Sequence, residues 1–335
     1  MNRPALLDRL SASGPFGFGA STLGNLYRRV EDDQARATVD AAWAAGVRYF
    51  DTAPFYGFGL SERRLGDALR ERPRDEFILS TKVGRLLVPG QAADDKFGFV
   101  SPMPFDPVFD YSYDGVMRSA EASLHRLGIA RIDILLMHDL GRLTHGDDHP
   151  RTFAQAVEGG FRAMTELRDA GIVSAIGLGV NEIEICEASL DHVDLDVLMI
   201  AGRYTLLDQG AAPFLAQCRT RNIGVIGAGV FNSGILATGT RGGTAHYDYE
   251  PAPEAIVQRV AAIEHCCDQF GVPLAAAALQ FVKANPAMTN IVVGTGNPAR
   301  IRQTAELARH AIPEAFWASL SAEGLIGEES VAAVD

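Results

Sequence analysis

Residues 49–66 read Tyr49-Phe-Asp-Thr-Ala-Pro-Phe-Tyr-Gly-Phe-Gly-Leu-Ser-Glu-Arg-Arg-Leu-Gly66 and contain the end of a strand, a loop and the start of a helix. A short β-type run over Val47–Phe50 ends on the acid Asp51, and a tight segment with one proline and two glycines follows. Ser61 then opens a helical pattern, for which it is the expected N-cap. We therefore expect Asp51 at the C-terminal tip of a strand, with Tyr56 in the loop above it. In parallel α/β proteins, ligands bind at that end of the strands.

The same strand-then-helix unit recurs along the chain at a spacing of roughly 35 residues, as in a barrel of alternating strands and helices. The expected strands cover residues 16–23, 47–51, 77–83, 132–138, 172–180, 196–200, 223–228 and 291–293. Eight such units without a change of composition predict one α/β domain over residues 1–335, a (β/α)8 barrel, because helices supply the crossovers between parallel strands. Residues 84–111 form a long loop in this prediction, and the tail 313–335 packs on the barrel. A doubly wound sheet is the alternative.

Composition narrows the class of protein. The chain has 335 residues, of which 47% are hydrophobic and 21% charged, and its net charge of −12 argues against a nucleic-acid or anionic membrane surface. Its first residues lack the apolar segment of a signal peptide, and no apolar run reaches the roughly 18 residues that a membrane span needs. The four cysteines are scattered, with Cys266 and Cys267 adjacent, which is typical of a reducing cytoplasm rather than a disulfide framework.

Four polar side chains are expected at one mouth of this barrel. Asp51, Lys82 and His138 end three successive strands, and Tyr56 follows the first of them. A tyrosine with a nearby ammonium can exchange protons, because the positive charge favours the phenolate and lowers its pKa. In this interpretation Asp51 holds Lys82, and His138 orients a substrate oxygen. Such a device interconverts carbonyls and alcohols, but it contains no hydride source, so it needs a nicotinamide cofactor.

The quoted stretch resembles the signature of the aldo-keto reductase family. Ser80-Thr81-Lys82-Val83 and Leu136-Met137-His138 are similar to the next two motifs of that family, and the resemblance covers nearly the whole chain. It implies a (β/α)8 fold with NAD(P) bound extended at the C-terminal ends of the strands. It also implies Tyr56 as the proton donor and acceptor, with Asp51, Lys82 and His138 in the roles described above.

Several positions depart from the family pattern around the expected cofactor. The usual Ser-Asn after the fifth strand is Gly179-Val180-Asn181 here, and Asn181 is the displaced equivalent. Nicotinamide packing then falls to Arg203 or Phe231. The segment 294–297 lacks the lysine that commonly pairs with the 2′-phosphate, so the resemblance implies NAD as the preferred cofactor and NADP as a second one. The expected cofactor contacts are Thr22, Leu23, Asp51, Asn181, Arg203, Val230, Phe231, Asn232, Gly234, Gly294, Thr295, Asn297, Arg300 and Gln303.

These departures resemble one subgroup of the family, the dehydrogenases that oxidise L-fucose and related D-threo-aldoses at C1. Residues 24–27, 84–89, 201–209 and 228–234 carry this likeness, and pyridoxal 4-dehydrogenases look similar over the same segments. Both oxidise a cyclic hemiacetal to a lactone, which makes Tyr56 the proton acceptor. Tyr27, Phe55, Tyr56 and His138 are the expected substrate contacts, and a sugar or an aldehyde is the expected small-molecule partner. General aldehyde or ketone reduction is a further alternative.

Other interpretations use parts of the same sequence. Polar residues gather in the segment 138–149 and could belong to a barrel metallohydrolase: His138, Asp139, His145, Asp147, Asp148 and His149. We expect no metal there, because the neighbouring strand ends carry Lys82 and Gly179. The glycines of residues 16–23 loosely match a dinucleotide fingerprint, but no helix opens directly after them. A non-catalytic cofactor-binding subunit is disfavoured because all four proposed catalytic residues are present.

Overall fold

The computed structural model describes residues 3–241, 246–248 and 250–327. Within these residues, eight parallel strands close into one barrel in the order β1, β2, β3, β8, β9, β10, β11 and β14, with β14 returning to β1. This confirms the predicted (β/α)8 fold. The barrel strands are β1 (Gly17–Gly19), β2 (Tyr49–Asp51), β3 (Ile78–Val83), β8 (Ile134–His138), β9 (Ala175–Val180), β10 (Val197–Ala201), β11 (Gly224–Ala228) and β14 (Met288–Val293).

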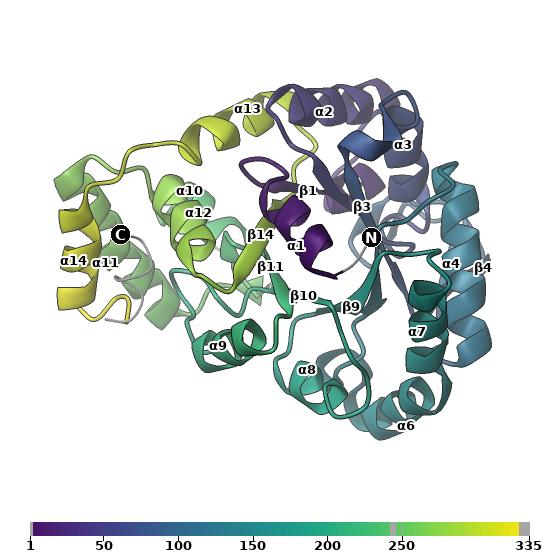
Figure 1. The fold of residues 1–335 in the computed structure, drawn as a ribbon. Helices are drawn as coiled ribbons and strands as arrows, with labels where there is room; N and C mark the ends of the chain where they lie inside the picture. The colour runs from purple at the N-terminus through teal and green to yellow at the C-terminus, as the bar shows by residue number, and fades with distance from the viewer. Residues whose placement is uncertain (1–2, 242–245, 249, 328–335) are drawn as a thin grey trace.

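Helices surround the barrel and cover its strands (Figure 1). The longer ones are α2 (Asp32–Ala44), α3 (Leu60–Leu69), α4 (Tyr113–Leu127), α6 (His149–Gln155), α7 (Phe161–Asp169), α8 (Glu184–Ser189), α9 (Ala212–Thr220), α11 (Glu254–Phe270), α12 (Leu274–Ala284) and α13 (Pro298–Leu307). A π-helical segment, Ala156–Gly160, joins α6 to α7 into one continuous helical run. Ser112 caps α4 by accepting a hydrogen bond from the Gly115 amide.

An N-terminal helix that the sequence patterns did not indicate, α1 (Arg3–Ser11), closes the barrel at the N-terminal ends of its strands (Figure 1). Leu6 and Leu10 are fully buried there among apolar side chains from the starts of several barrel strands. The Asn290 side chain on β14 donates a hydrogen bond of 2.7 Å to the Leu10 carbonyl. The prediction missed α1 because only two of its nine residues are buried, which leaves no clear apolar stripe.

Two local predictions were wrong. Ser61 is not an N-cap, because Gly59 begins α3 in a left-handed conformation (φ +95°) that a glycine adopts without strain. The Ser61 hydroxyl instead donates to the Ala20 carbonyl at 2.7 Å and lies 2.9 Å from the Thr52 hydroxyl. The first strand is also shorter than predicted, since a 3₁₀ helix occupies Ala20–Gly24.

The predicted loop over residues 84–111 contains two antiparallel ribbons. The strand β4 (Arg85–Pro89) pairs with β7 (Phe105–Phe109), and β5 (Asp95–Lys96) pairs with β6 (Phe99–Val100). Prolines in this segment favoured a loop, but a two-stranded ribbon has free edges on which proline loses no ladder hydrogen bond. The segment between β11 and α11 contains η5 (Asn232–Gly234), α10 (Ile235–Thr238) and the short ribbon of β12 (His246–Tyr247) with β13 (Glu250–Pro251).

The tail contacts the outer helices of the barrel. The helix α14 (Glu314–Ala322) packs against α11 (Figure 1). Its Phe316 and Trp317 are buried, Phe316 beside Phe270 of α11 and Trp317 beside Phe281 of α12. The predicted tail continued to residue 335, of which residues 328–335 lie outside the described part of the chain. No helix in the described ranges combines the length and apolar character needed to cross a membrane.

Truncating the α1 contact should destabilise the fold. We expect Leu10→Ala to lower the free energy of unfolding by about 2–5 kcal/mol, since it removes a fully buried side chain and leaves a cavity. Leu143→Ala is the matched control, because Leu143 is 68% exposed and should change stability by less than about 0.5 kcal/mol. Urea unfolding of both variants measures the difference, and equal midpoints would show that α1 does not stabilise the barrel.

Candidate active site

The structure brings the four predicted catalytic side chains together. Asp51 ends β2, Lys82 lies in β3 and His138 ends β8, and these three strands are neighbours in the barrel. The Lys82 ammonium lies 2.7 Å from Asp51 Oδ2 and 3.2 Å from the Tyr56 hydroxyl. The ring centroids of Tyr56 and His138 are 6.0 Å apart. The cluster therefore spans three strand ends and the loop after β2.

Lys82 is the central cation of this cluster and is 2% exposed. Its ammonium also donates to the second Asp51 oxygen at 2.9 Å and to the Thr52 carbonyl at 3.0 Å. Ser80 donates a further hydrogen bond to Asp51 at 2.7 Å. Burial by itself lowers the pKa of Lys82, but the Asp51 carboxylate and Tyr56 raise it above its ordinary value. Lys82 therefore stays protonated beside the phenol.

The pKa of the Tyr56 hydroxyl differs from the one that the sequence predicted. Burial raises the pKa of Tyr56 to about 12, and the opposing effect of the Lys82 charge does not outweigh it. The expectation of a lowered pKa was wrong because it counted the charge and not the loss of solvent. In the cofactor-free protein Tyr56 is a neutral phenol at neutral pH. Its oxygen accepts the Lys82 hydrogen bond, which leaves its proton available to another group.

His138 is a buried, neutral imidazole. Burial lowers its pKa well below the ordinary value, and the positive charges of Arg85 and Lys82 act in the same direction. The Tyr111 hydroxyl donates to the His138 backbone carbonyl at 2.8 Å, which fixes the end of β8. A neutral imidazole carries one donor and one acceptor nitrogen, so His138 can donate one hydrogen bond to a substrate oxygen.

Aromatic rings line the space beside these groups. The Phe55 ring lies 6.4 Å from the His138 ring, 5.9 Å from Phe97 and 5.4 Å from Phe99. Phe97 is 65% exposed, and Tyr27 is equally exposed beside it, with the Tyr27 amide donating to Gly98 at 2.8 Å. The sequence identified Phe55 and Tyr27 but missed Phe97 and Phe99. Four phenylalanines between residues 97 and 109 were the available signal, although their directions depend on the ribbons.

The residues predicted around the nicotinamide come from three strand ends. Asn232 is 3% exposed, and neither atom of its side-chain amide has a hydrogen-bond partner among the described residues. A buried amide without partners costs about 1–3 kcal/mol, so this side chain fits a ligand that would satisfy it. Arg203 donates to the Asn181 carbonyl at 2.7 Å and pairs with Asp248 at 3.1 Å, so its guanidinium already has protein partners. Phe231 is half-buried against the core.

A second group of predicted cofactor contacts lies where β1 meets β14. The Thr22 hydroxyl is buried without a partner in the described chain, which again fits a ligand. Gly294 follows β14 so closely against β1 that a Cβ there would lie 2.9 Å from the Gly19 carbonyl oxygen. Because Gly294 has no side chain, only backbone atoms lie at this position between β1 and β14. Thr22 and Gly294 thus belong to one edge of the mouth.

The helix α13 begins at this edge. Asn297 caps it by accepting a hydrogen bond from the Ala299 amide at 2.9 Å, as predicted, and the Thr295 hydroxyl accepts from the Asn297 amide at 3.2 Å. Arg300 and Gln303 are exposed on the first turns of the helix. The side chains of Asn297 and Thr295 therefore organise the loop. Arg300 is an exposed cation beside it, and the Arg28 guanidinium also lies near Gly296.

Three other predicted cofactor contacts offer no side chain to a ligand. The Leu23 and Val230 side chains are buried in the hydrophobic core, so only their backbone atoms are open to a ligand. Gly234 adopts a left-handed conformation (φ +101°) at the start of α10, which accounts for the glycine there. These positions shape the loop after β11 rather than present side chains to the mouth.

The polar segment after β8 has protein partners of its own. The His145 Nε2 atom lies 2.9 Å from the Tyr111 hydroxyl, and the His149 Nδ1 atom lies 3.2 Å from the Leu140 carbonyl. Asp147 and Asp148 are exposed. Over the described part of the chain, no three His, Cys, Asp or Glu side chains gather in a way that could hold a metal ion.

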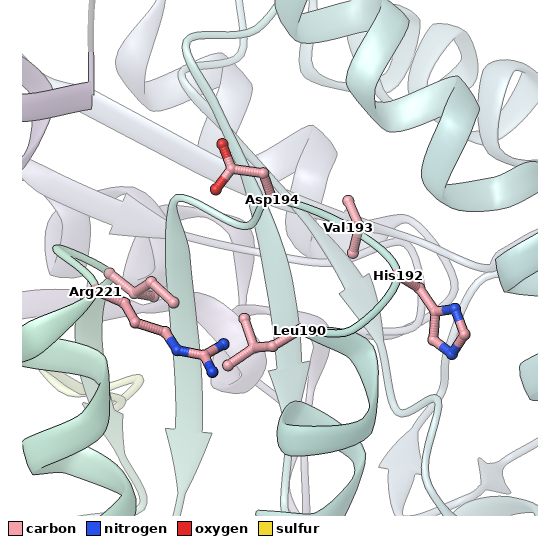
Figure 2. A pocket seen from close by; sticks show the side chains of 6 residues that line it. Leu190, His192, Val193, Asp194 and Arg221 are labelled. Atoms are coloured by element: carbon pink, nitrogen blue, oxygen red, sulfur yellow. The ribbon is translucent and has the colours of Figure 1, made fainter.

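A surface pocket of about 530 Å³ lies away from this cluster. It is lined by Leu190, His192, Val193, Asp194, Arg221 and Ile223 (Figure 2). These residues precede β10 and β11, so the pocket lies at the opposite end of the strands from Lys82 and Tyr56. Asp194 is already paired with Arg3 of α1 at 2.7 Å. The chemistry of the molecule belongs to the mouth and not to this pocket.

Comparisons with known proteins agree with this geometry. The sequence profile described as "Aldo/keto reductase family" matches residues 15–322. The chain is 46% identical to pyridoxal 4-dehydrogenase of Microbacterium luteolum over 92% of its own length and 94% of the relative. It is 41% identical to D-threo-aldose 1-dehydrogenase of a Pseudomonas species, with the same two coverages. A holo aldo-keto reductase structure from Bacillus halodurans has the same fold, with a TM-score of 0.69 at 20% identity and coverages of 95% and 91%. These findings confirm the resemblance drawn from the sequence.

Removing the Lys82 charge should change the pH dependence of alcohol oxidation. Lys82→Met should raise the pKa of Tyr56 further, because it removes the cation that favours the phenolate. The phenolate is then rarer at any given pH, so kcat/KM for oxidation should fall by roughly 10²–10⁴-fold and its rise with pH should move to higher pH.

The double variant Asp51→Asn/Lys82→Met avoids a buried unpaired carboxylate and should show the same shift. Lys283→Met is the control, since Lys283 is an exposed lysine on α12 that donates to the Pro15 carbonyl, away from the mouth. A pH profile that is unchanged in folded Lys82→Met protein would contradict the role of Lys82.

Proposed function

The chain belongs to the aldo/keto reductase family, and we propose that this oxidoreductase converts a cyclic hemiacetal into a lactone with NAD. One observation carries the proposal. The buried pair Asp51 and Lys82 and the half-buried Tyr56 form a hydrogen-bonded series that ends on a phenol beside His138. The names of the two relatives, an aldose 1-dehydrogenase and a pyridoxal 4-dehydrogenase, support a hemiacetal as the substrate class.

Each residue has one part in the proposed reaction. Tyr56 takes the proton of the hemiacetal hydroxyl while hydride leaves the same carbon, and the C–O bond becomes the lactone carbonyl. Lys82 stabilises the phenolate, and Asp51 keeps Lys82 charged and in place. His138 donates a hydrogen bond to the reacting oxygen. The oxidised nicotinamide, when bound, supplies the hydride acceptor and a positive charge that favours the phenolate.

Two orphaned polar groups support a bound nicotinamide nucleotide at the mouth. The Asn232 amide and the Thr22 hydroxyl are buried without partners in the described residues, at the two edges where the cofactor contacts were predicted. The segment 294–297 carries no lysine, and the nearby cations are Arg300 on α13 and Arg28, whose guanidinium lies beside Gly296. A 2′-phosphate would lack the lysine partner that commonly holds it in this family, which supports NAD over NADP.

Two substrates fit the proposal. An aldose of the L-fucose type is supported by the likeness to D-threo-aldose 1-dehydrogenase. The hemiacetal of pyridoxal is supported by Phe55, which lies beside His138, and by the exposed ring of Phe97, because a flat heteroaromatic ring stacks on such side chains. A sugar needs several polar contacts, and these rings offer few. The lining therefore favours pyridoxal of the two.

We also place the protein in the cytoplasm, acting on a small molecule as one domain, without a nucleic-acid or membrane partner. All four cysteines are free thiols and are buried, which supports a reducing compartment. The net charge of −12 supports the absence of a polyanionic partner.

A substrate panel tests the function. NADH formation should be measured with L-fucose, D-arabinose, L-galactose and pyridoxal, and at least one should be oxidised. Tyr56→Phe should abolish turnover while NAD binding, followed by fluorescence titration, changes little. Phe97→Ala should raise KM for pyridoxal more than for a sugar, because it removes stacking surface. Turnover that survives in Tyr56→Phe, or no oxidation of any hemiacetal, would contradict the proposal.

The ratio of kcat/KM values for NAD and NADP tests the cofactor. We expect NAD to be preferred by about tenfold or more, since one charge-assisted hydrogen bond to a phosphate contributes that much. Arg300→Met should lower the remaining activity with NADP and leave that with NAD unchanged. Arg302→Met on the same exposed helix is the control. A strong preference for NADP would show this inference to be wrong.

A further inference from the structure

A second ion pair lies at the same mouth, outside the four residues described so far. Arg85 begins β4 directly after Gly84, and Asp139 directly follows His138. The guanidinium Nη2 atom of Arg85 donates to Asp139 Oδ2 at 2.6 Å. The Arg85 side chain is 6% exposed and that of Asp139 is 21% exposed. The pair therefore joins the strands β3 and β8 just beyond their C-terminal ends.

Arg85 also contacts the imidazole. Its Nη1 atom lies 3.4 Å from His138 Nδ1. The guanidinium carbon lies 4.0 Å from the centre of the Phe55 ring and 4.9 Å from that of Phe109, so two aromatic faces hold the group in place. A guanidinium has five N–H donors and no acceptor. The His138 Nδ1 atom that faces it must therefore be the unprotonated, accepting nitrogen.

We propose that Arg85, held by Asp139, is a positioning residue that keeps His138 neutral with its proton on Nε2. The Nε2–H group is then the donor left for the substrate oxygen. This inference rests on the proposed role of His138. It adds the reason why this imidazole has one tautomer, since the two tautomers of an isolated histidine differ little and a neighbour selects between them.

The charges around His138 act in a defined balance. Lys82 from β3 and Arg85 from β4 both disfavour the imidazolium. Asp139 opposes them, because its Oδ2 atom lies 3.5 Å from His138 Nε2. Tyr56 and Tyr111 face the residue as neutral phenols, Tyr111 through the backbone carbonyl of His138.

Removing Arg85 would change the charges around His138 in two ways. It would withdraw one cation, and it would free the Asp139 carboxylate to attract a proton onto the ring. Both changes raise the pKa of His138 toward or above its ordinary value.

The backbone fixes Asp139 for this contact. Its φ is +46°, a left-handed conformation that aspartate adopts only at some cost. The Asp139 amide donates to the Gly179 carbonyl at 3.0 Å, and the Tyr111 hydroxyl lies 3.1 Å from the Asp139 carbonyl oxygen. Such a turn directs the carboxylate back to Arg85 instead of onward along the chain. The strained residue and the buried cation thus support one another.

Nitrogen-15 NMR of histidine-labelled protein tests the proposal without substrate or cofactor. The His138 signals are identified by their loss in His138→Gln. In the natural protein they should report a neutral ring with a protonated Nε2 across neutral and mildly acidic pH. In Arg85→Met they should report mixed tautomers, and a doubly protonated ring as the pH falls.

The conservative variant separates charge from geometry. Arg85→Lys keeps a cation for Asp139 but loses the planar fork, so the ring should stay neutral while its tautomers mix. Arg74→Met is the matched control, because Arg74 pairs with Asp133 at 2.6 Å at the opposite ends of the same two strands. It should lower thermal stability and leave the His138 signals unchanged. Unchanged His138 signals in folded Arg85→Met would overturn the proposal.

Kinetics give an independent readout. Below neutral pH, kcat/KM of Arg85→Met should lose about tenfold per pH unit more than that of the natural protein, because the imidazolium replaces the neutral donor. The double variant Arg85→Met/Asp139→Asn removes both charges and should recover most of this loss. If the natural protein oxidises no hemiacetal, the proposed function is contradicted, and the NMR measurement alone then decides whether Arg85 controls the tautomer of His138. Normal turnover with an unaltered acid limb in Arg85→Met would overturn this inference alone.

Discussion

The ion pair between Lys82 and Asp51 is the constraint on which the rest of the site depends. Both groups are almost fully buried, and a charge taken out of water is costly unless it is paired and hydrogen-bonded. Each oxygen of Asp51 accepts a bond, and Lys82 has acceptors on β2 and on the loop that follows it. Because the pair joins β2 to β3, strand register and catalytic geometry are set by the same contact.

Burial acts on the three titratable groups of the mouth in different ways. It raises the pKa of Tyr56, lowers that of His138, and is overcome at Lys82 by the adjacent carboxylate. Among these three groups the mouth therefore contains a neutral acid, Tyr56, a neutral donor, His138, and a fixed cation, Lys82. A dry site strengthens each electrostatic interaction made with a substrate, since there is little water to screen it. The aromatic rings packed against Phe55 add apolar surface beside this site.

The sequence predicted the barrel and the four converging residues because both follow from local signals. Periodic apolar runs mark strands and helices, and the polar residues that end three strands must share one mouth in a parallel barrel. The two ribbons within residues 84–111 could not be predicted from the sequence. Prolines and glycines indicate where the chain turns, but they do not indicate which segments pair as strands. Arg85 was missed for the same reason, since its contacts depend on the direction of β4. The predicted direction of the Tyr56 pKa shift was wrong, because the sequence indicates neighbouring charges but not how far the side chain is removed from solvent.

The helix α1 has a consequence for the order in which the molecule is made. Leu10 receives its hydrogen bond from Asn290, a partner 280 residues later in the chain. The first helix leaves the ribosome early, but its docking surface is complete only when the last barrel strand has been synthesised. Such distant contacts carry a high cost of loop closure and slow the final folding step. During that interval the apolar faces of Leu6 and Leu10 and the open barrel edge stay exposed, which makes the unfinished chain prone to aggregation.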